Sequence, residues 1–268
     1  DKLLGVFAIG DKRLTFHTKL AHRLSILGLP CYADYYRLMV SDPTREELYN
    51  FISHITNNET YFQRETARIS LFAGLLADIK RYRQKKGEHA VTIVSAGCSS
   101  GEEAYTLNIM LMESGLFSWG WDVKVIGIDV NKIALKKAKS AVYTRNSFRM
   151  LDGTEEFCRK YFDEKDGLYT LKNPYRANVQ LRHGNILEAG VLEGIGSIDV
   201  VFCRNVFIYL NDDAIRRVAA NFYRHLEDEG YLFIGSSESL LNKTELFVSE
   251  LKEGNILYRK NPLASPKG

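Results

Sequence analysis

The most informative pattern in the chain is a short apolar run that ends in a glycine-containing turn. Residues 91–95 (VTIVS) are rich in β-branched side chains and too few for a helix, so they predict a buried strand. Apolar positions in residues 102–113 recur at helical spacing, which places Gly97 and Gly101 in a strand-to-helix turn. A second strand is predicted at residues 122–129. Strands and helices that alternate in this way are typical of an open α/β sheet.

The flanking patterns divide the rest of the chain. An amphipathic pattern before the first strand predicts helices only, and about 40 residues without a sheet strand after the second strand indicate an insertion. The last two apolar runs predict an antiparallel hairpin. The expected division is a helical N-terminal domain at 1–78, a linker at 79–88, an α/β domain at 89–262 with an inserted β-subdomain at about 142–178, and a disordered tail at 263–268.

The carboxyl ends of the predicted strands indicate a nucleoside site. Glycines let the backbone approach a ligand, and Asp129 at the end of its strand can accept both hydroxyls of a ribose. The G-x-x-x-G spacing of Gly97 and Gly101 differs from the G-x-G-x-x-G that cradles a pyrophosphate. The pattern therefore favours S-adenosylmethionine, which has an adenosine but no phosphates. The alternative is that the glycines only form a tight turn and that Asp129 caps the next helix.

Composition excludes several classes of protein. The chain has 268 residues, 45% hydrophobic and 26% charged, and a net charge of +3 is too small to indicate a nucleic-acid partner. No apolar run approaches the roughly 20 residues that span a bilayer, and no signal peptide opens the chain, so we expect a cytoplasmic protein without membrane insertion. The isolated cysteines and histidines predict free buried thiols and no metal site.

Two polar patterns suggest binding surfaces. In residues 58–65 (NETYFQRE), Asn58, Thr60 and Arg64 can present an amide, a hydroxyl and a guanidinium together. The alternative is that Asn58 or Thr60 is an N-cap and Arg64 a surface residue. Lys19 and Arg23, one helical turn apart, form either a docking face for an acidic helix or an ordinary solvated face.

Several separated motifs together resemble the CheR-type chemotaxis receptor protein-glutamate O-methyltransferases. The resemblance covers about residues 12–260. It implies an α/β fold: a class I methyltransferase (Rossmann-like) domain with an inserted small antiparallel β-subdomain, preceded by an all-α N-terminal domain. The motifs are NETYFQRE at 58–65, SAGCSSGEEAYT at 95–106, GID at 127–129, HGNIL at 183–187 and FCRNVFIY at 202–209.

The resemblance also implies an activity and a set of site residues. In that family, S-adenosylmethionine methylates glutamate side chains on the cytoplasmic helices of chemoreceptors, leaving S-adenosylhomocysteine. Arg64 is the expected clamp on the cofactor or acceptor, and Tyr209 either positions the acceptor or only covers the cleft. We expect a monomer whose partner is the chemoreceptor cytoplasmic domain. The expected cofactor contacts are Asn58, Thr60, Arg64, Gly97, Glu103, Asp129, Asn185, Ile186, Arg204 and Asn205.

The chain departs from the family pattern at three places. Ala104 replaces a common proline and Gln63 a common phenylalanine, and neither position carries a polar contact group. The turn at residues 163–167 is short. Longer versions of this hairpin loop accompany recognition of a receptor's C-terminal pentapeptide, so the short turn favours a member without that tether.

Three other hypotheses compete with this one. Methyltransferases that act on base amines often carry an N/D-P-P-Y-type motif, which residues 203–209 lack. A nicotinamide oxidoreductase should have the missing pyrophosphate fingerprint. A non-catalytic S-adenosylmethionine-binding regulator would bind the cofactor without turnover.

Overall fold

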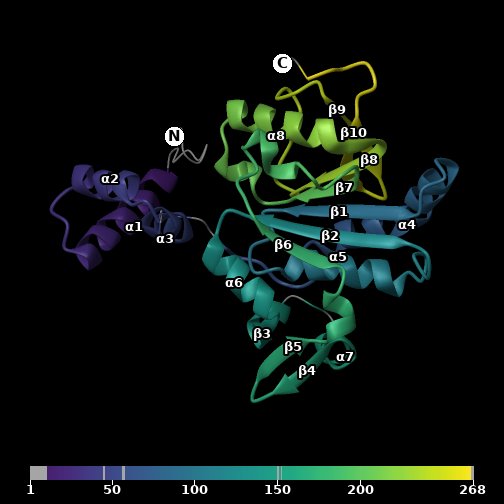
Figure 1. Cartoon of the computed structure of the whole chain (residues 1–268), viewed down its shortest axis with the longest axis horizontal. Helices are drawn as coiled ribbons and strands as arrows, with labels where there is room; N and C mark the ends of the chain where they lie inside the picture. The colour runs from purple at the N-terminus through teal and green to yellow at the C-terminus, as the bar shows by residue number, and fades with distance from the viewer. Residues whose placement is uncertain (1–10, 45, 56–57, 150, 152, 267–268) are drawn as a thin grey trace.

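The computed structural model describes residues 11–44, 46–55, 58–149, 151 and 153–266, with the side chains of residues 11–16 and 55 excepted. Within these residues a seven-stranded sheet has the order β6-β2-β1-β7-β8-β10-β9 (Figure 1). The first five strands in this order are parallel to one another, and β10 pairs antiparallel with both β8 and β9. This arrangement confirms the predicted class I methyltransferase fold. The strands are β1 (Ala90–Ala96), β2 (Asp122–Asp129), β6 (Val179–His183), β7 (Ile198–Cys203), β8 (Leu226–Ile234), β9 (Phe247–Lys252) and β10 (Asn255–Lys260).

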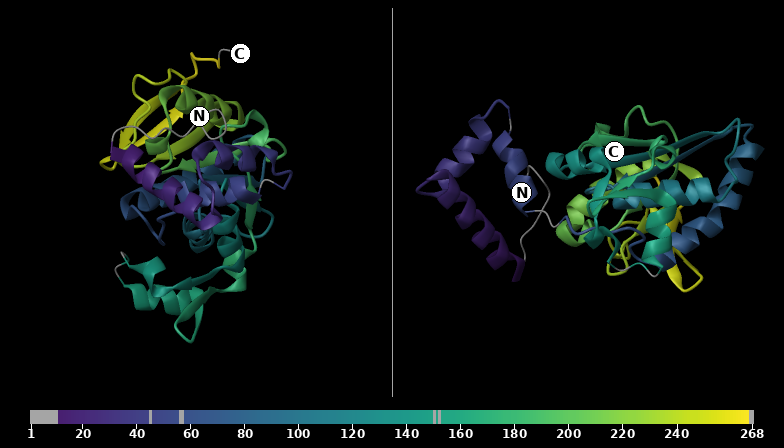
Figure 2. Two further views of the ribbon diagram at one scale, coloured as in Figure 1. Left: turned by 90° about the vertical axis from the view of Figure 1, so that its left-hand side faces the viewer. Right: turned by 90° about the horizontal axis from the view of Figure 1, so that it is seen from below.

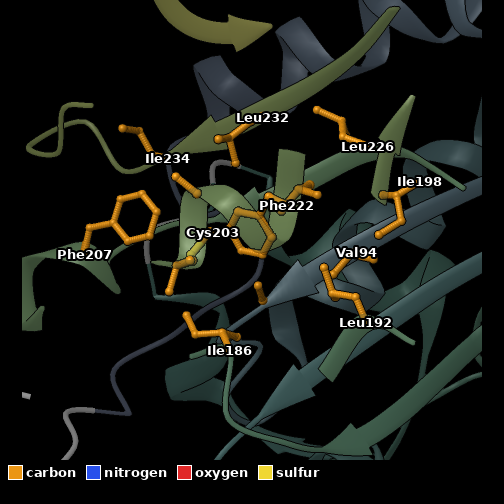
Figure 3. Packing of buried hydrophobic residues seen from close by; sticks show 14 of the residues in the cluster. Val94, Ile186, Leu192, Ile198, Cys203, Phe207, Phe222, Leu226, Leu232 and Ile234 are labelled. Carbon is orange, nitrogen blue, oxygen red and sulfur yellow. The ribbon is translucent and has the colours of Figure 1, made fainter. Parts of the chain in front are cut away.

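Helices cover both faces of this sheet. Side chains along β1 alternate between the two cores: Ile93 packs with α4 and α5, whereas Val94 packs with α8. Figure 3 shows Val94 and Phe222 of α8 in the second core. The helices are α4 (Thr66–Lys85), α5 (Glu102–Glu113), α6 (Lys132–Ser140) and α8 (Asp212–His225), and the short 3₁₀ helices are η1 (Arg145–Phe148), η2 (Asn173–Arg176), η3 (Ala189–Leu192) and η4 (Phe207–Tyr209).

The linker expected at residues 79–88 is instead largely helix. Helix α4 continues to Lys85, and Arg83, which is 2% exposed, anchors it to the sheet. Its Nε and Nη2 donate to the two carboxylate oxygens of Asp199 at 2.6 and 2.9 Å, and Nη1 donates to Glu227 at 3.0 Å. The basic residues read as a linker therefore include a buried cation, and α4 belongs to the sheet layer rather than to the helical domain expected at 1–78.

The first three described helices form a separate group beside the sheet (Figures 1 and 2). They are α1 (Asp11–Leu27), α2 (Tyr32–Ser41) and α3 (Glu46–Ile55), and residues 1–10 of the expected helical domain lie outside the described part. The group meets the sheet domain through Tyr49 of α3. The Lys132 ammonium lies 3.6 Å from the centroid of the Tyr49 ring, and the His183 ring centroid lies 5.0 Å from it.

The insertion is a small antiparallel sheet with the strand order β3-β5-β4, as expected. Its two-residue turn, Asp166 and Gly167, has φ of 52° and 72°, so β4 and β5 join by a tight hairpin. The loop is therefore as short as the sequence indicated. The elements are β3 (Val142–Thr144), α7 (Thr154–Tyr161), β4 (Phe162–Lys165) and β5 (Leu168–Leu171).

Part of the segment after β10 is hydrogen-bonded to α8. Tyr223 donates its hydroxyl to the carbonyl oxygens of Asn261 and Ala264, at 3.0 and 2.6 Å. The expectation of a disordered tail at 263–268 stays a prediction, and residues 267–268 lie outside the described part. No helix of the described residues combines the length and apolarity needed to cross a membrane.

The buried cation of α4 gives the first prediction. Arg83→Met leaves the buried Asp199 carboxylate without its cation, while Glu227 keeps its bonds from Tyr82 and Lys86. The change should lower the free energy of unfolding by about 3–5 kcal/mol in urea denaturation. The control is Arg81→Met, because the Arg81 side chain is 66% exposed in the same helix. If both variants unfolded at the wild-type urea concentration, Arg83 would not anchor the helix.

Candidate active site

A cavity of about 220 Å³ lies at the carboxyl ends of the parallel strands. The strand register brings these ends to one edge, because Ala96 pairs with Ile128, Ser95 with Phe202, and Asp129 with His183. The chain order reverses between β1 and β7, and such a switch point is where open α/β sheets bind ligands. All ten residues expected to contact the cofactor line this cavity, as does Tyr209. The structure therefore brings the predicted set together, while the role of each member stays a prediction.

Gly97, in the turn after β1, lets another loop of the same chain approach this turn closely. Gly97 has φ of 83°, and its N–H donates to the carbonyl oxygen of Ile128 at 2.7 Å. A Cβ atom at Gly97 would lie 2.5 Å from Cγ2 of Val206. Gly97 is therefore required because the loop after β7 packs directly on the turn after β1, which closes one side of the cavity.

Asp129 is fixed at the end of β2 by two backbone groups. Its Oδ2 accepts from the N–H of Ser99 and its Oδ1 from the N–H of Asn131, both at 2.7 Å. Burial raises the pKa of Asp129, and the two backbone N–H groups oppose that rise. The cap of α6 is Asn131, whose Oδ1 accepts from Ile133 and Ala134, so the helix-capping alternative for Asp129 is wrong. Each Asp129 oxygen has a further acceptor position for a ligand hydroxyl.

A buried ion pair forms another part of the wall. The Arg204 side chain is 2% exposed, and its Nε donates to Oε2 of Glu103 at 2.7 Å. Oε1 of Glu103 accepts from the hydroxyl of Ser95 at 2.6 Å. Arg204 also donates from Nη1 to the carbonyl oxygen of Arg64 at 2.6 Å. The pair therefore connects β1, α5 and β7 to the segment 58–65.

The segment 58–65 is anchored in the inserted subdomain by Phe62, which is 1% exposed. The Phe62 ring stacks on the Phe148 ring with centroids 5.1 Å apart. The backbone N–H of Phe62 donates to the carbonyl oxygen of Ser147 at 2.9 Å. The sequence pattern of this polar segment did not indicate the anchor. The cap of α4 is Glu65, so neither Asn58 nor Thr60 is the N-cap that was considered as an alternative.

Within this anchored segment the Arg64 side chain is held by its own neighbours. Its Nη1 donates to the carbonyl oxygen of Glu59 at 2.7 Å, and its guanidinium carbon lies 5.6 Å from the centroid of the Tyr61 ring. Because Arg64 also lines the cavity, it offers a positive charge to a ligand there. The Arg64 side chain is half-buried, and whether it contacts a ligand or is only a surface residue stays a prediction.

A second residue that sequence reasoning missed is Glu238, in the turn after β8. Its carboxylate accepts from the backbone N–H groups of Asn205, Ile208 and Gly235. No motif in the sequence marks these bonds, because backbone donors leave no side-chain signature.

The expected docking pair needs revision. Arg23 donates from Nε and Nη2 to both carboxylate oxygens of Glu47, at 2.9 and 2.6 Å, and the hydroxyl of Tyr35 donates to the same carboxylate at 2.7 Å. Although burial alone would raise it, the pKa of Glu47 lies below its usual value because Arg23 and Tyr35 donate to it. Arg23 thus holds α1 to α3 and offers little charge to a partner. Lys19 is half-buried, and its docking role stays a prediction.

The cysteines follow the sequence expectation with one exception. Cys98, Cys158 and Cys203 are free and buried, whereas Cys31 is exposed. Burial raises the pKa of the Cys98 and Cys203 thiols well above the usual value, which makes them poor nucleophiles. Within the described residues, no group of three or more His, Cys, Asp or Glu side chains could hold a metal ion.

Comparison with known proteins gives the same picture. Residues 58–254 match the family model described as CheR methyltransferase, SAM binding domain. The "Chemotaxis protein methyltransferase 2" of Vibrio cholerae serotype O1 is 32% identical over 245 residues, 91% of this chain and 83% of that protein. Its namesake in Pseudomonas aeruginosa is 30% identical, over 91% of this chain and 85% of that protein. The "Probable biofilm formation methyltransferase WspC" of Pseudomonas putida is 36% identical, over 68% of this chain and 42% of that protein. The chain belongs to the CheR family of S-adenosylmethionine-dependent methyltransferases.

Proposed function

We propose that this protein transfers a methyl group from S-adenosylmethionine to glutamate side chains on the cytoplasmic helices of chemoreceptors. The products are glutamate methyl esters and S-adenosylhomocysteine. The observation that carries the proposal is that five separate stretches of chain converge on one cavity at the switch point of the sheet. The family match and the names of the chemotaxis relatives support it. A cytoplasmic, monomeric protein fits this substrate, and both properties stay predictions.

The cavity wall has the chemistry that the cofactor requires. Asp129 supplies acceptors for the two hydroxyls of a ribose, and Ile186 is an apolar side chain suited to an adenine ring. The amino-acid end of the cofactor carries one positive and one negative charge. Arg64 supplies a positive charge. Glu103, although it is paired with Arg204, keeps a further acceptor position on each carboxylate oxygen for the ammonium group. Both residues line the cavity.

The proposed reaction needs little acid–base chemistry from the protein. A glutamate carboxylate has a reference pKa of about 4.3, so at neutral pH it is ionised and ready to act as the nucleophile. S-Adenosylmethionine supplies the methyl group as an activated sulfonium. What remains for the chain is to hold acceptor and cofactor in line and to exclude water, an alignment that supplies about 7–11 kcal/mol in favourable cases. The absence of a catalytic triad motif in the sequence is consistent with this demand.

Arg64 and Tyr209 are the residues that we assign to the reacting end of the cavity. The Arg64 guanidinium clamps a carboxylate, either that of the cofactor or that of the incoming glutamate. Tyr209 belongs to η4, directly after the loop that contains Arg204, and lines the same cavity. We assign it to positioning the acceptor.

The proposal is tested by transfer of a radiolabelled methyl group to a chemoreceptor cytoplasmic fragment, followed by mild alkali. We expect label on the receptor fragment and its release as volatile methanol, because alkali hydrolyses a methyl ester but not a methylated amine. Label that survives alkali would contradict glutamate as the acceptor. Cofactor binding without any transfer would favour the non-catalytic regulator.

Asp129 gives a prediction on cofactor affinity. Asp129→Ala should weaken S-adenosylmethionine binding by about 1.5–3 kcal/mol, or roughly 10- to 150-fold in Kd, because it removes hydrogen bonds to a charged group. Isothermal titration calorimetry measures this change. The control is Asp122→Ala, because the Asp122 side chain is 58% exposed at the opposite end of the same strand. Equal affinities in the two variants would remove Asp129 from the cofactor site.

Arg64 gives a prediction on turnover. Arg64→Ala should reduce methyl transfer by about 100-fold through lost alignment. The fold should persist, because the contact from Arg204 goes to the main-chain carbonyl of residue 64, which alanine retains. Arg81→Ala, a change at an exposed arginine, is the matched control. Wild-type turnover in Arg64→Ala at an unchanged melting temperature would refute the assignment.

A further inference from the structure

Glu238 joins the two loops that follow β7 and β8. Its Oε2 accepts from the backbone N–H of Asn205 at 2.9 Å and from that of Gly235 at 2.6 Å. Its Oε1 accepts from the backbone N–H of Ile208 at 3.1 Å. One carboxylate therefore receives three backbone donors from two loops, and hydrogen bonds to an ionised acceptor are the stronger kind.

The space for this carboxylate is kept open by a glycine. A Cβ atom at Gly235 would lie 2.7 Å from Oε2 of Glu238 and 3.0 Å from the backbone nitrogen of Asn205. Any larger residue at position 235 would push the carboxylate away from both donors. The hydrogen bonds from Gly235 and Asn205 to Glu238 therefore depend on glycine at position 235.

The loop held in this way forms one side of the cavity. Asn205 has φ of 59°, a left-handed backbone conformation that asparagine adopts more readily than most L residues. Asn205, Val206, Ile208 and Tyr209 all line the cavity. The Glu238 carboxylate accepts hydrogen bonds from both ends of the turn that leads to Tyr209, at Asn205 and at Ile208.

We infer that Glu238 is a positioning residue, which fixes the backbone of residues 205–209 so that Tyr209 meets the incoming glutamate. This inference rests on the proposed function and adds a residue to it. Of the expected cofactor contacts that line the cavity, only Asn205 donates to Glu238. Asp129, Glu103 and Arg64 lie on other elements, so losing the bonds to Glu238 disturbs the acceptor side of the cavity more than the cofactor side.

The direct test is Glu238→Gln, which keeps the size of the side chain but leaves one acceptor oxygen. An amide cannot accept from all three backbone groups, because its NH₂ would face an N–H donor. The matched control is Glu245→Gln, which removes the same charge from an exposed residue of the same C-terminal region. For both variants, hydrogen–deuterium exchange at residues 204–210, cofactor Kd by calorimetry, and kcat and KM for a receptor fragment are measured.

In Glu238→Gln we expect amides of residues 204–210 to exchange about tenfold faster, since the bonds that protect them are weakened. Methyl transfer should fall by about 10- to 100-fold in kcat/KM for the receptor fragment. Cofactor Kd should change by a smaller factor than kcat/KM, because among the expected cofactor contacts only Asn205 donates to Glu238. Combined with Tyr209→Phe, the losses should be less than additive, because both substitutions act on the same contact. Glu245→Gln should resemble the wild type in each measurement.

Two results would overturn the inference: unchanged exchange and kcat/KM in Glu238→Gln, or losses that are fully additive with those of Tyr209→Phe. Failure of the proposed function is a separate outcome. It would show as no alkali-labile label in the wild type, whereas exchange at residues 204–210 still reports whether Glu238 holds the loop.

Discussion

The Arg204 guanidinium is buried, so its N–H groups need hydrogen-bond acceptors from the protein in place of water. The arrangement of the cavity follows from that constraint. A buried cation is tolerated only where partners replace its hydration. The partners of Arg204 are Glu103, at the start of α5, and, from the segment before α4, the carbonyl oxygen of Arg64 and the carboxylate of Glu65 at 3.7 Å. Three stretches far apart in sequence are thereby held in one geometry. The cavity is the space that this geometry leaves at the edge of the sheet.

The inserted subdomain takes part in the same construction. Its aromatic cluster receives Phe62 from the segment 58–65, with ring centroids 5.1 Å from Phe148 and 4.9 Å from Tyr143. The segment is thus held by the subdomain at Phe62 and by the sheet domain at the carbonyl of Arg64. An insertion that looks like an accessory to the sheet therefore supports the cavity wall. Only Gln63 separates Phe62, which packs in the subdomain, from Arg64, which lines the cavity.

The sequence predicted most of what depends on local pattern. Strands β1 and β2, the turn at Gly97 and Gly101, and the inserted hairpin follow from apolar periodicity and turn residues. Misses came from contacts between distant residues. Arg83 was assigned to the linker at 79–88 because its ion-pair partner, Asp199, is far away in the sequence. Arg23 looked like a surface cation because its partner, Glu47, lies on another helix. Glu238 gave no signal, since its donors are backbone groups.

The central claim is that one cavity, built from strand ends and the segment 58–65, holds the cofactor. A crystal structure with S-adenosylhomocysteine tests it most directly. We expect the ribose hydroxyls within hydrogen-bond distance of Asp129 and the amino-acid end between Arg64 and Glu103. A ligand seated outside this cavity, or one whose ribose does not contact Asp129, would contradict it.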